Sequence, residues 1–246
     1  MKAINKKLMK MRFRNLILWV TLYAIGMAFL ESSVVVYIRE LLYPDGFDFP
    51  LSSLDGSLAI TEILRELATL IMLLSVACIA GKNFSTGFAW FIYAFAIWDI
   101  FYYIFLLLII GWPESILTWD VLFLIPVTWT GPVLSPLIEC LVMIALSLLL
   151  ILYSEKGIKT KLLPAEWLIM TGGALIVIVA FSWDYTSYIL DKYSFADIWN
   201  LPDNRAILEY ATGYIPRSFN WMLFSAGNIL IISAIILIYR RFSRSR

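Results

Sequence analysis

Six apolar runs dominate the sequence, and each is long enough to cross a membrane as a helix. They cover residues 15–38, 58–81, 86–110, 133–153, 164–184 and 219–240. The hydrocarbon core of a bilayer is about 30 Å thick, so a helix that spans it needs about 20 apolar residues. A water-soluble domain would not need such runs, and 61% of the 246 residues are hydrophobic. The sequence therefore predicts an all-α integral membrane protein, with one domain over residues 1–246 built as a bundle of six transmembrane helices.

The positions of Lys and Arg predict how this bundle sits in the membrane. Basic residues form four groups along the chain. They are Lys2, Lys6, Lys7, Lys10, Arg12 and Arg14 in the N-terminal tail, Lys82 in the turn after the second run, Lys156, Lys159 and Lys161 after the fourth run, and Arg240, Arg241, Arg244 and Arg246 at the end of the chain. Cytoplasmic loops carry an excess of Lys and Arg. All four groups fall on one side of a six-span chain, so we expect both termini to be cytoplasmic. The first run lacks a convincing cleavage site, which indicates a retained signal anchor.

Two segments do not fit a simple span. The chain is almost uncharged from Asp120 to Tyr153, too long for one straight crossing, and prolines at 126, 132 and 136 interrupt helical hydrogen bonding. We therefore expect a re-entrant or interfacial segment near 120–132, with irregular backbone. In the outer loop 185–218, we expect either a partly ordered loop or a short interfacial helix that starts near Asp203 or Asn204. The apolar side of that helix would carry Ile207, Leu208 and Tyr210.

Four of the six runs carry carboxyl groups away from their end turns. Counted at 1.5 Å per residue, Glu31 and Asp99 lie about 25 Å and 21 Å from the cytoplasmic ends of their spans. The same count puts Glu62, Glu66 and Glu139 in the outer half of the membrane as well. A single hydrogen bond to a neighbour would be enough to stabilise a protonated Glu139, so we interpret this residue as structural. The other carboxyl groups lie at similar depths, which predicts a polar site there.

Three helical faces are expected to converge on an outward-facing acidic and aromatic pocket. Glu62, Arg65 and Glu66 are spaced i, i+3 and i+4, which places them on one face of a helix. The expected ligand-binding residues are Glu31, Glu62, Arg65, Glu66, Asp99, Tyr102, Tyr103 and Asp120. Asp120 and Asp184 would stand at the rim of this pocket.

The pocket has more carboxyl groups than cations, and ionised groups inside a bilayer are costly unless they are paired or hydrated. Carboxylate oxygens suit hard ions such as Mg²⁺, Ca²⁺ or Mn²⁺, so one interpretation is a divalent cation held by Glu62, Glu66 and Asp99. The alternative is an interhelical salt-bridge network around Arg65 with no ligand. The chain has no histidine, which excludes haem or zinc sites that depend on it. A net charge of +1 gives no reason to expect nucleic acid as a partner.

Several short stretches resemble a known group of proteins. "ESSVVVYIRELLYP", "ELATL" after Glu62, "WDIFYY", "GWPESILTWDVLFLIP" and "GPVLSP" are similar to motifs of bacterial six-span inner-membrane proteins of uncharacterised activity. The shared patterns are ExxxxVYIRE, ExxREXATL, WDIFYY and TWDVLFLIP, within about residues 28–137. The resemblance implies a multi-pass protein of the bacterial inner membrane, and it implies no chemistry.

Three functions are compatible with these features. The first is binding of a cation or a polar small molecule in the outward-facing pocket. The second is a membrane enzyme that acts on a lipid or isoprenoid at the outer leaflet, although the sequence contains no GxSxG or GxGxxG motif. The third is a structural or assembly subunit, whose partners would be other membrane subunits and the bilayer. Glycines at 172, 173 and 227 are expected to serve as close helix contacts rather than as ligand sites.

Overall fold

The computed structural model describes residues 2–44, 46–52, 56–125, 127–198 and 205–244. Its elements are α1 (Lys2–Leu42), α2 (Gly56–Ala80), α3 (Phe84–Ile110), β1 (Trp119–Phe123), β2 (Trp129–Pro132), α4 (Leu134–Glu155), α5 (Pro164–Leu190), α6 (Phe195–Ile198), α7 (Arg205–Thr212) and α8 (Trp221–Arg244). Six of these helices are long and apolar enough to cross a membrane: α1, α2, α3, α4, α5 and α8. The predicted all-α bundle of six transmembrane helices is therefore confirmed.

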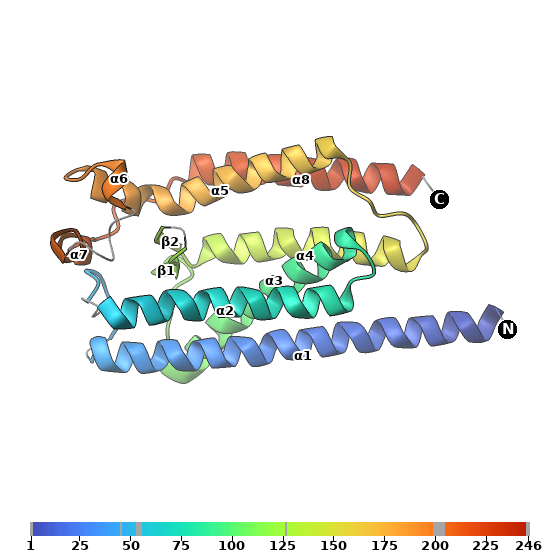
Figure 1. Cartoon of the computed structure of the whole chain (residues 1–246), viewed down its shortest axis with the longest axis horizontal. Helices are drawn as coiled ribbons and strands as arrows, with labels where there is room; N and C mark the ends of the chain where they lie inside the picture. The colour runs from blue at the N-terminus through green and yellow to red at the C-terminus, as the bar shows by residue number, and fades with distance from the viewer. Residues whose placement is uncertain (1, 45, 53–55, 126, 199–204, 245–246) are drawn as a thin grey trace.

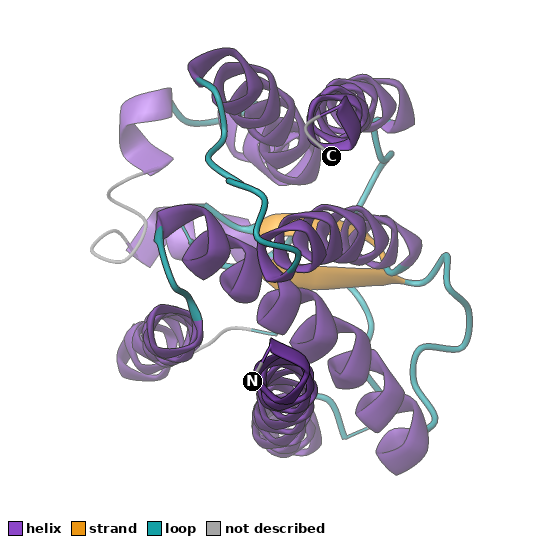
Figure 2. Ribbon diagram, turned by 90° about the vertical axis from the view of Figure 1, so that its right-hand side faces the viewer, coloured by secondary structure: helices purple, strands orange, loops and turns teal. Residues whose placement is uncertain are grey.

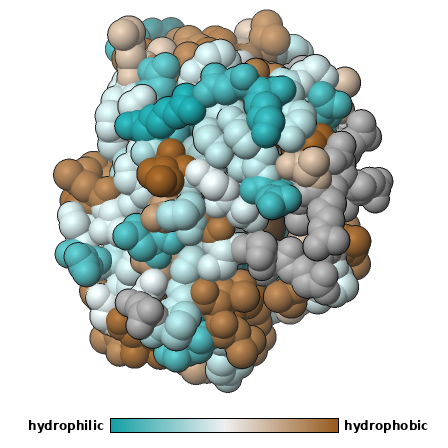
Figure 3. All heavy atoms as spheres, turned by 90° about the vertical axis from the view of Figure 1, so that its left-hand side faces the viewer, coloured by the Kyte–Doolittle hydropathy of each residue, from teal (hydrophilic) through white to brown (hydrophobic). Residues whose placement is uncertain are grey.

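The six long helices run side by side along the long axis of the molecule, and both chain termini lie at the same end (Figure 1). The strands, α6 and α7 lie at the opposite end, which we call the distal end. Figure 2 looks along the bundle and shows the two strands near the centre of its outline, with helices around them. Polar residues cover much of the distal end (Figure 3).

The large apolar side chains divide between an interior and an outer surface. An interior cluster of buried residues includes Leu73, Trp90 and Leu150. Many others are exposed on the outside of the bundle, such as Ile79 at 85% and Leu168 at 75%. Large apolar side chains exposed on every long helix are expected of a molecule whose solvent is lipid rather than water.

Local signals in the sequence determine where the helices end. The side chain of Asn83 accepts a hydrogen bond from the backbone N–H of Thr86, whose hydroxyl accepts one from the N–H of Asn83. This reciprocal capping box starts α3. The helix ends at Gly111, whose φ of 67° is the left-handed conformation that glycine adopts without steric cost. The capping box at Asn83 and the glycine at 111 therefore determine the two ends of α3.

The segment near 120–132 is a β-hairpin. Strands β1 and β2 pair antiparallel, with Asp120 opposite Gly131 and a shift in register between Val121 and Phe123. The expectation of irregular backbone is wrong here, because strand pairing satisfies the backbone groups that the prolines leave without a helix. The hairpin leads directly into α4.

The outer loop is held in place by Asp184 at the distal part of α5. Its carboxylate accepts hydrogen bonds from the hydroxyl of Tyr214 at 2.7 Å and from the backbone N–H of Arg217 at 2.9 Å. Asp184 therefore fixes the loop that follows α7 instead of standing at the rim of the polar pocket. Helix α7 carries the buried Ile207. The expected helix start at Asp203 or Asn204 lies outside the described residues.

Helices α5 and α8 approach each other closely through glycine. A Cβ atom added to Gly173 would lie 2.7 Å from the carbonyl oxygen of Gly227, and one added to Gly227 would lie 2.8 Å from the carbonyl oxygen of Gly173. Gly172, in contrast, has nothing within 4 Å of such an atom. Gly173 and Gly227 thus form the small-residue contact that the sequence predicts.

Candidate functional site

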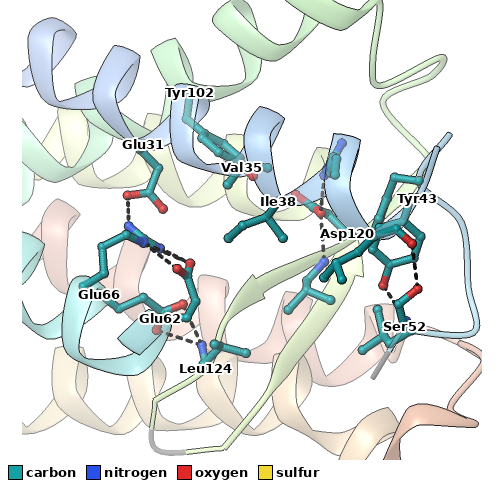
Figure 4. A pocket seen from close by; sticks show the side chains of 16 residues that line it. Glu31, Val35, Ile38, Tyr43, Ser52, Glu62, Glu66, Tyr102, Asp120 and Leu124 are labelled. Carbon is teal, nitrogen blue, oxygen red and sulfur yellow. Dashed lines mark hydrogen bonds and ion pairs between the residues drawn. The ribbon is translucent and has the colours of Figure 1, made fainter. Parts of the chain in front are cut away.

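A polar pocket of about 170 Å³ lies at the distal end of the bundle. Its walls come from α1, the segment after α1, the first turns of α2, the distal part of α3, and β1 with the residue that follows it. The ionisable residues in its lining are Glu31, Arg39, Tyr43, Glu62, Arg65, Glu66, Tyr102 and Asp120. Figure 4 shows Glu31 reaching from α1 toward Glu62 on α2, with Asp120 at the far side of the pocket.

Arg65 links α1 and α2. Its Nε donates to both carboxylate oxygens of Glu62 at 2.9 Å, and its Nη1 donates to Glu31. Their side chains are only 12% to 21% exposed, so the ion pairs are largely screened from solvent. A guanidinium group presents a planar fork of donors that two carboxylates can fill. This network therefore accounts for two of the carboxyl groups in the pocket.

Glu66 has a different environment from Glu62. Its two carboxylate oxygens lie 3.2 Å and 3.0 Å from the backbone nitrogen of Leu124, which donates to them. The residue is 7% exposed, and among the described residues no ion pair involves Glu66. Because a buried carboxylate is expensive without a cation, Glu66 is the group that a positively charged ligand would best complement.

Arg39 and Asp120 form a buried ion pair at 3.2 Å. The guanidinium carbon of Arg39 lies 3.7 Å from the ring centre of Trp112 and 4.2 Å from that of Phe47, so two aromatic faces also contact the cation. Asp120 accepts a further hydrogen bond from the hydroxyl of Tyr103 at 3.2 Å. Burial raises the pKa of Asp120 to about 6, although Arg39 and Tyr103 act in the opposite direction.

The charges that line the pocket do not balance. Glu31, Glu62, Glu66 and Asp120 supply four carboxyl groups, whereas the described lining contains two guanidinium groups. The formal surplus is therefore two negative charges. Tyr43 and Tyr102 add hydroxyl groups and ring faces to the same space. Such a lining can hold a small cation by charge and by contact with aromatic rings.

The structure brings six of the eight expected ligand-binding residues together in the pocket: Glu31, Glu62, Arg65, Glu66, Tyr102 and Asp120. The other two, Asp99 and Tyr103, are absent from its described lining. Tyr103 donates a hydrogen bond to Asp120, which lines the pocket. Asp99 instead lines a second and larger cavity, where it accepts a hydrogen bond from the thiol of Cys140 at 3.1 Å.

The expected divalent-cation site is not found in the structure. In the described part of the chain, no group of three or more His, Cys, Asp or Glu side chains could hold a metal ion. The physical reason is the orientation of α3 about its own axis, which places Asp99 in the wall of the larger cavity and not in the wall that Glu62 and Glu66 form. Glu62 and Glu66 line the polar pocket and Asp99 lines the larger cavity, so the three carboxyl groups do not face one common space.

Two contributors to the pocket were missed from the sequence. The backbone N–H of Leu124 is one, because its position depends on a hairpin that was not expected. The contact between Tyr43 and Ser52 is the other: the hydroxyl of Tyr43 accepts from the backbone N–H of Ser52 at 2.7 Å and closes the segment after α1. A signal for the hairpin was present in the tryptophans at 119 and 129, since aromatic residues favour strands.

No protein-family model, curated protein or solved structure matches this chain. The function is therefore inferred from the geometry and charge of the pocket.

Proposed function

We propose that this chain is a multi-pass protein of the bacterial inner membrane that binds a small cation in an outward-facing pocket. Both termini would be cytoplasmic, so the distal end would face outward. The ligand class is a cation or small cationic molecule, such as a primary amine, rather than a divalent metal. The membrane location follows from the six apolar helices, and the bacterial inner membrane from the resemblance of residues 28–137.

The observation that carries this proposal is the environment of Glu66. The residue is buried, and within the described part of the chain its hydrogen bonds come from one backbone N–H. It also lines a cavity with a formal surplus of negative charge. An ammonium group near Glu66 would reduce the surplus and supply the missing cationic partner. The rings of Tyr102 and Tyr43 would contact the same ligand.

The orientation of the bundle rests on the distribution of Lys and Arg. The loops at the end that holds the termini carry Lys82, Lys156, Lys159 and Lys161. A reporter that is active only in the cytoplasm, fused in turn to each terminus, tests this orientation. Activity from neither fusion would reverse the assignment of the outward face.

Ligand-dependent stability tests the binding of a cation. Thermal unfolding would be measured in lipid nanodiscs at constant ionic strength, with ethanolamine and with ethylene glycol as the uncharged molecule of similar size. A ligand at a hundred times its Kd stabilises a protein by about 2.7 kcal/mol. We expect ethanolamine to raise the Tm and ethylene glycol to leave it unchanged.

Glu66→Gln removes the charge with little change of shape, and we expect it to abolish the ethanolamine effect. Glu40→Gln is the matched control, because Glu40 is exposed on α1 and does not line the pocket. An equal effect of the two small molecules, or a full ethanolamine effect in Glu66→Gln, would refute the proposal.

A further inference from the structure

The second cavity has about 540 Å³ of volume, roughly three times that of the polar pocket. Its walls come from α2, α3 and α4 on one side and α5 and α8 on the other, with Leu122, Phe123 and Trp129 of the hairpin at its distal end. We call it the apolar cavity. It lies wholly outside the polar pocket described above and shares none of its lining residues.

The apolar cavity is elongated along the helices. On α3 its lining extends from Phe88 to Asp99, which corresponds to about 16 Å of helix, and on α5 from Trp167 to Phe181, or about 21 Å. This length is roughly two thirds of a hydrocarbon core of about 30 Å. A long, narrow occupant parallel to the helices would fit this shape better than a compact one.

The lining is almost entirely hydrocarbon. Apart from the carboxyl groups of Asp99 and Glu139, the hydroxyl of Thr171 and two tryptophan rings, its side chains are aliphatic, thioether or phenyl groups. Water would find few hydrogen-bond partners in such a space, and apolar cavities stay dry or bind apolar ligands. An empty cavity would also lose the dispersion contacts that a filled one makes. The interior therefore favours an alkyl or prenyl chain.

The cavity reaches the surface of the bundle at α5. Thr171 and Ala174 line it and are also exposed, and their neighbours on the outer face of α5, Leu168 and Leu175, are 75% and 57% exposed. Because this apolar surface of a membrane-spanning helix faces lipid, molecules of the bilayer can enter the cavity through the opening.

The polar end of the apolar cavity selects among lipids. Asp99 from α3 and Glu139 from α4 lie toward the hairpin, where Asp99 accepts from Cys140 and Glu139 accepts from the side-chain amide of Asn228 at 2.6 Å. Two carboxyl groups disfavour a phosphate or carboxylate headgroup by like charge. An uncharged hydroxyl group can donate to either of them.

We propose that the apolar cavity binds one uncharged lipid alcohol from the bilayer, with its chain along α5 and its hydroxyl group at Asp99 or Glu139. The two sites share no lining residue, so a failure to bind a cation would not contradict the binding of a lipid. It assigns a role to Asp99, which the polar pocket does not use.

Photolabelling with a diazirine analogue of hexadecanol tests this site. The protein in nanodiscs would be irradiated with the probe and the labelled residues mapped by mass spectrometry. We expect labels on residues of the cavity wall such as Met143, Met170 and Val177, with competition by unlabelled hexadecanol and much weaker competition by palmitate. Labels confined to lipid-facing residues outside the cavity, or equal competition by palmitate, would overturn the proposal.

A matched pair of variants identifies the opening. Ala174→Phe fills the mouth of the cavity, and we expect it to lower labelling of the wall about tenfold, which corresponds to about 1.4 kcal/mol of binding. Leu175→Phe adds a ring on the adjacent, lipid-facing position and should leave labelling unchanged. Glu40→Gln, at an exposed position of α1 outside both linings, should also leave it unchanged. Equal labelling in Ala174→Phe and Leu175→Phe would contradict the assigned opening.

Discussion

The two cavities share one strand but differ in what holds them together. β1 and the residue after it supply Asp120, Val121 and Leu124 to the polar pocket, and Leu122 and Phe123 to the apolar cavity. The lining changes from the polar pocket to the apolar cavity between Val121 and Leu122, where the register of the strand pair shifts, so the segment does not follow the strict alternation of a regular strand. On one face the neighbours are charged groups from α1 and α2; on the other they are aromatic and aliphatic groups from α3, α4 and α5.

The two regions should therefore respond to different perturbations. The polar pocket depends on which charges are present and how they are paired, so changes of charge or pH should act there. The apolar cavity depends on volume and close packing, so added or removed methyl groups should act there.

Asp120→Ala should have the largest effect, because it leaves the buried Arg39 without its carboxylate partner. Removing one member of a buried ion pair typically destabilises a protein by about 3 to 5 kcal/mol. The measurement is the free energy of unfolding in mixed micelles. As the control, the double variant Arg39→Met with Asp120→Leu should lose less stability than Asp120→Ala, since it leaves no buried charge unpaired. A loss below about 1 kcal/mol for Asp120→Ala would contradict this role of the pair.

The same carboxyl group predicts a dependence of stability on pH. Burial raises the pKa of Asp120 from its ordinary value near 3.8 to about 6 in the folded protein. Between these values the folded state holds a proton that the unfolded state has lost. Stability should therefore fall as the pH rises from 4 to 6, by at most about 3 kcal/mol. Denaturant titrations across this range would measure it, and Asp120→Asn should show a smaller slope. Identical slopes in the wild type and the variant would assign the pH dependence to other groups.

Gly173→Ala should destabilise the wall of the apolar cavity. The added methyl group would lie 2.7 Å from the carbonyl oxygen of Gly227, so α5 and α8 must separate. Overpacking of this kind costs about 1 to 3 kcal/mol. Gly172→Ala is the matched control, because it adds the same atom in open space and should stabilise the helix by up to about 1 kcal/mol. Thermal unfolding would compare them, and equal effects would show that the close approach is not under strain.

Much of the fold could be predicted from the sequence. Apolar runs of sufficient length determine the six helices, because only a helix satisfies its own backbone groups in lipid. Residue spacing also predicted that Glu62, Arg65 and Glu66 share a face, and the count of residues along each span predicted that Glu31 lies at their depth. Arg65 does bridge Glu31 and Glu62 in the structure.

The remaining features depend on quantities that a residue count does not contain. Counting gives the height of Asp99 along α3, but its direction depends on how α3 rotates against its neighbours, and it points into the apolar cavity. The hairpin is similar, since five residues of strand within an apolar stretch give too little periodicity to distinguish them from other structures. Without the hairpin, the N–H of Leu124 that binds Glu66 could not be placed.

The shared strand also has a thermodynamic consequence. A ligand that displaces β1 from one side alters the lining of the space on the other side, because residues 120, 121 and 124 line the polar pocket and residues 122 and 123 line the apolar cavity. Linkage requires this influence to be mutual: the factor by which a lipid changes the affinity for a cation equals the factor by which the cation changes the affinity for the lipid. The hairpin would then act as an allosteric element between the membrane interior and the polar face of the molecule.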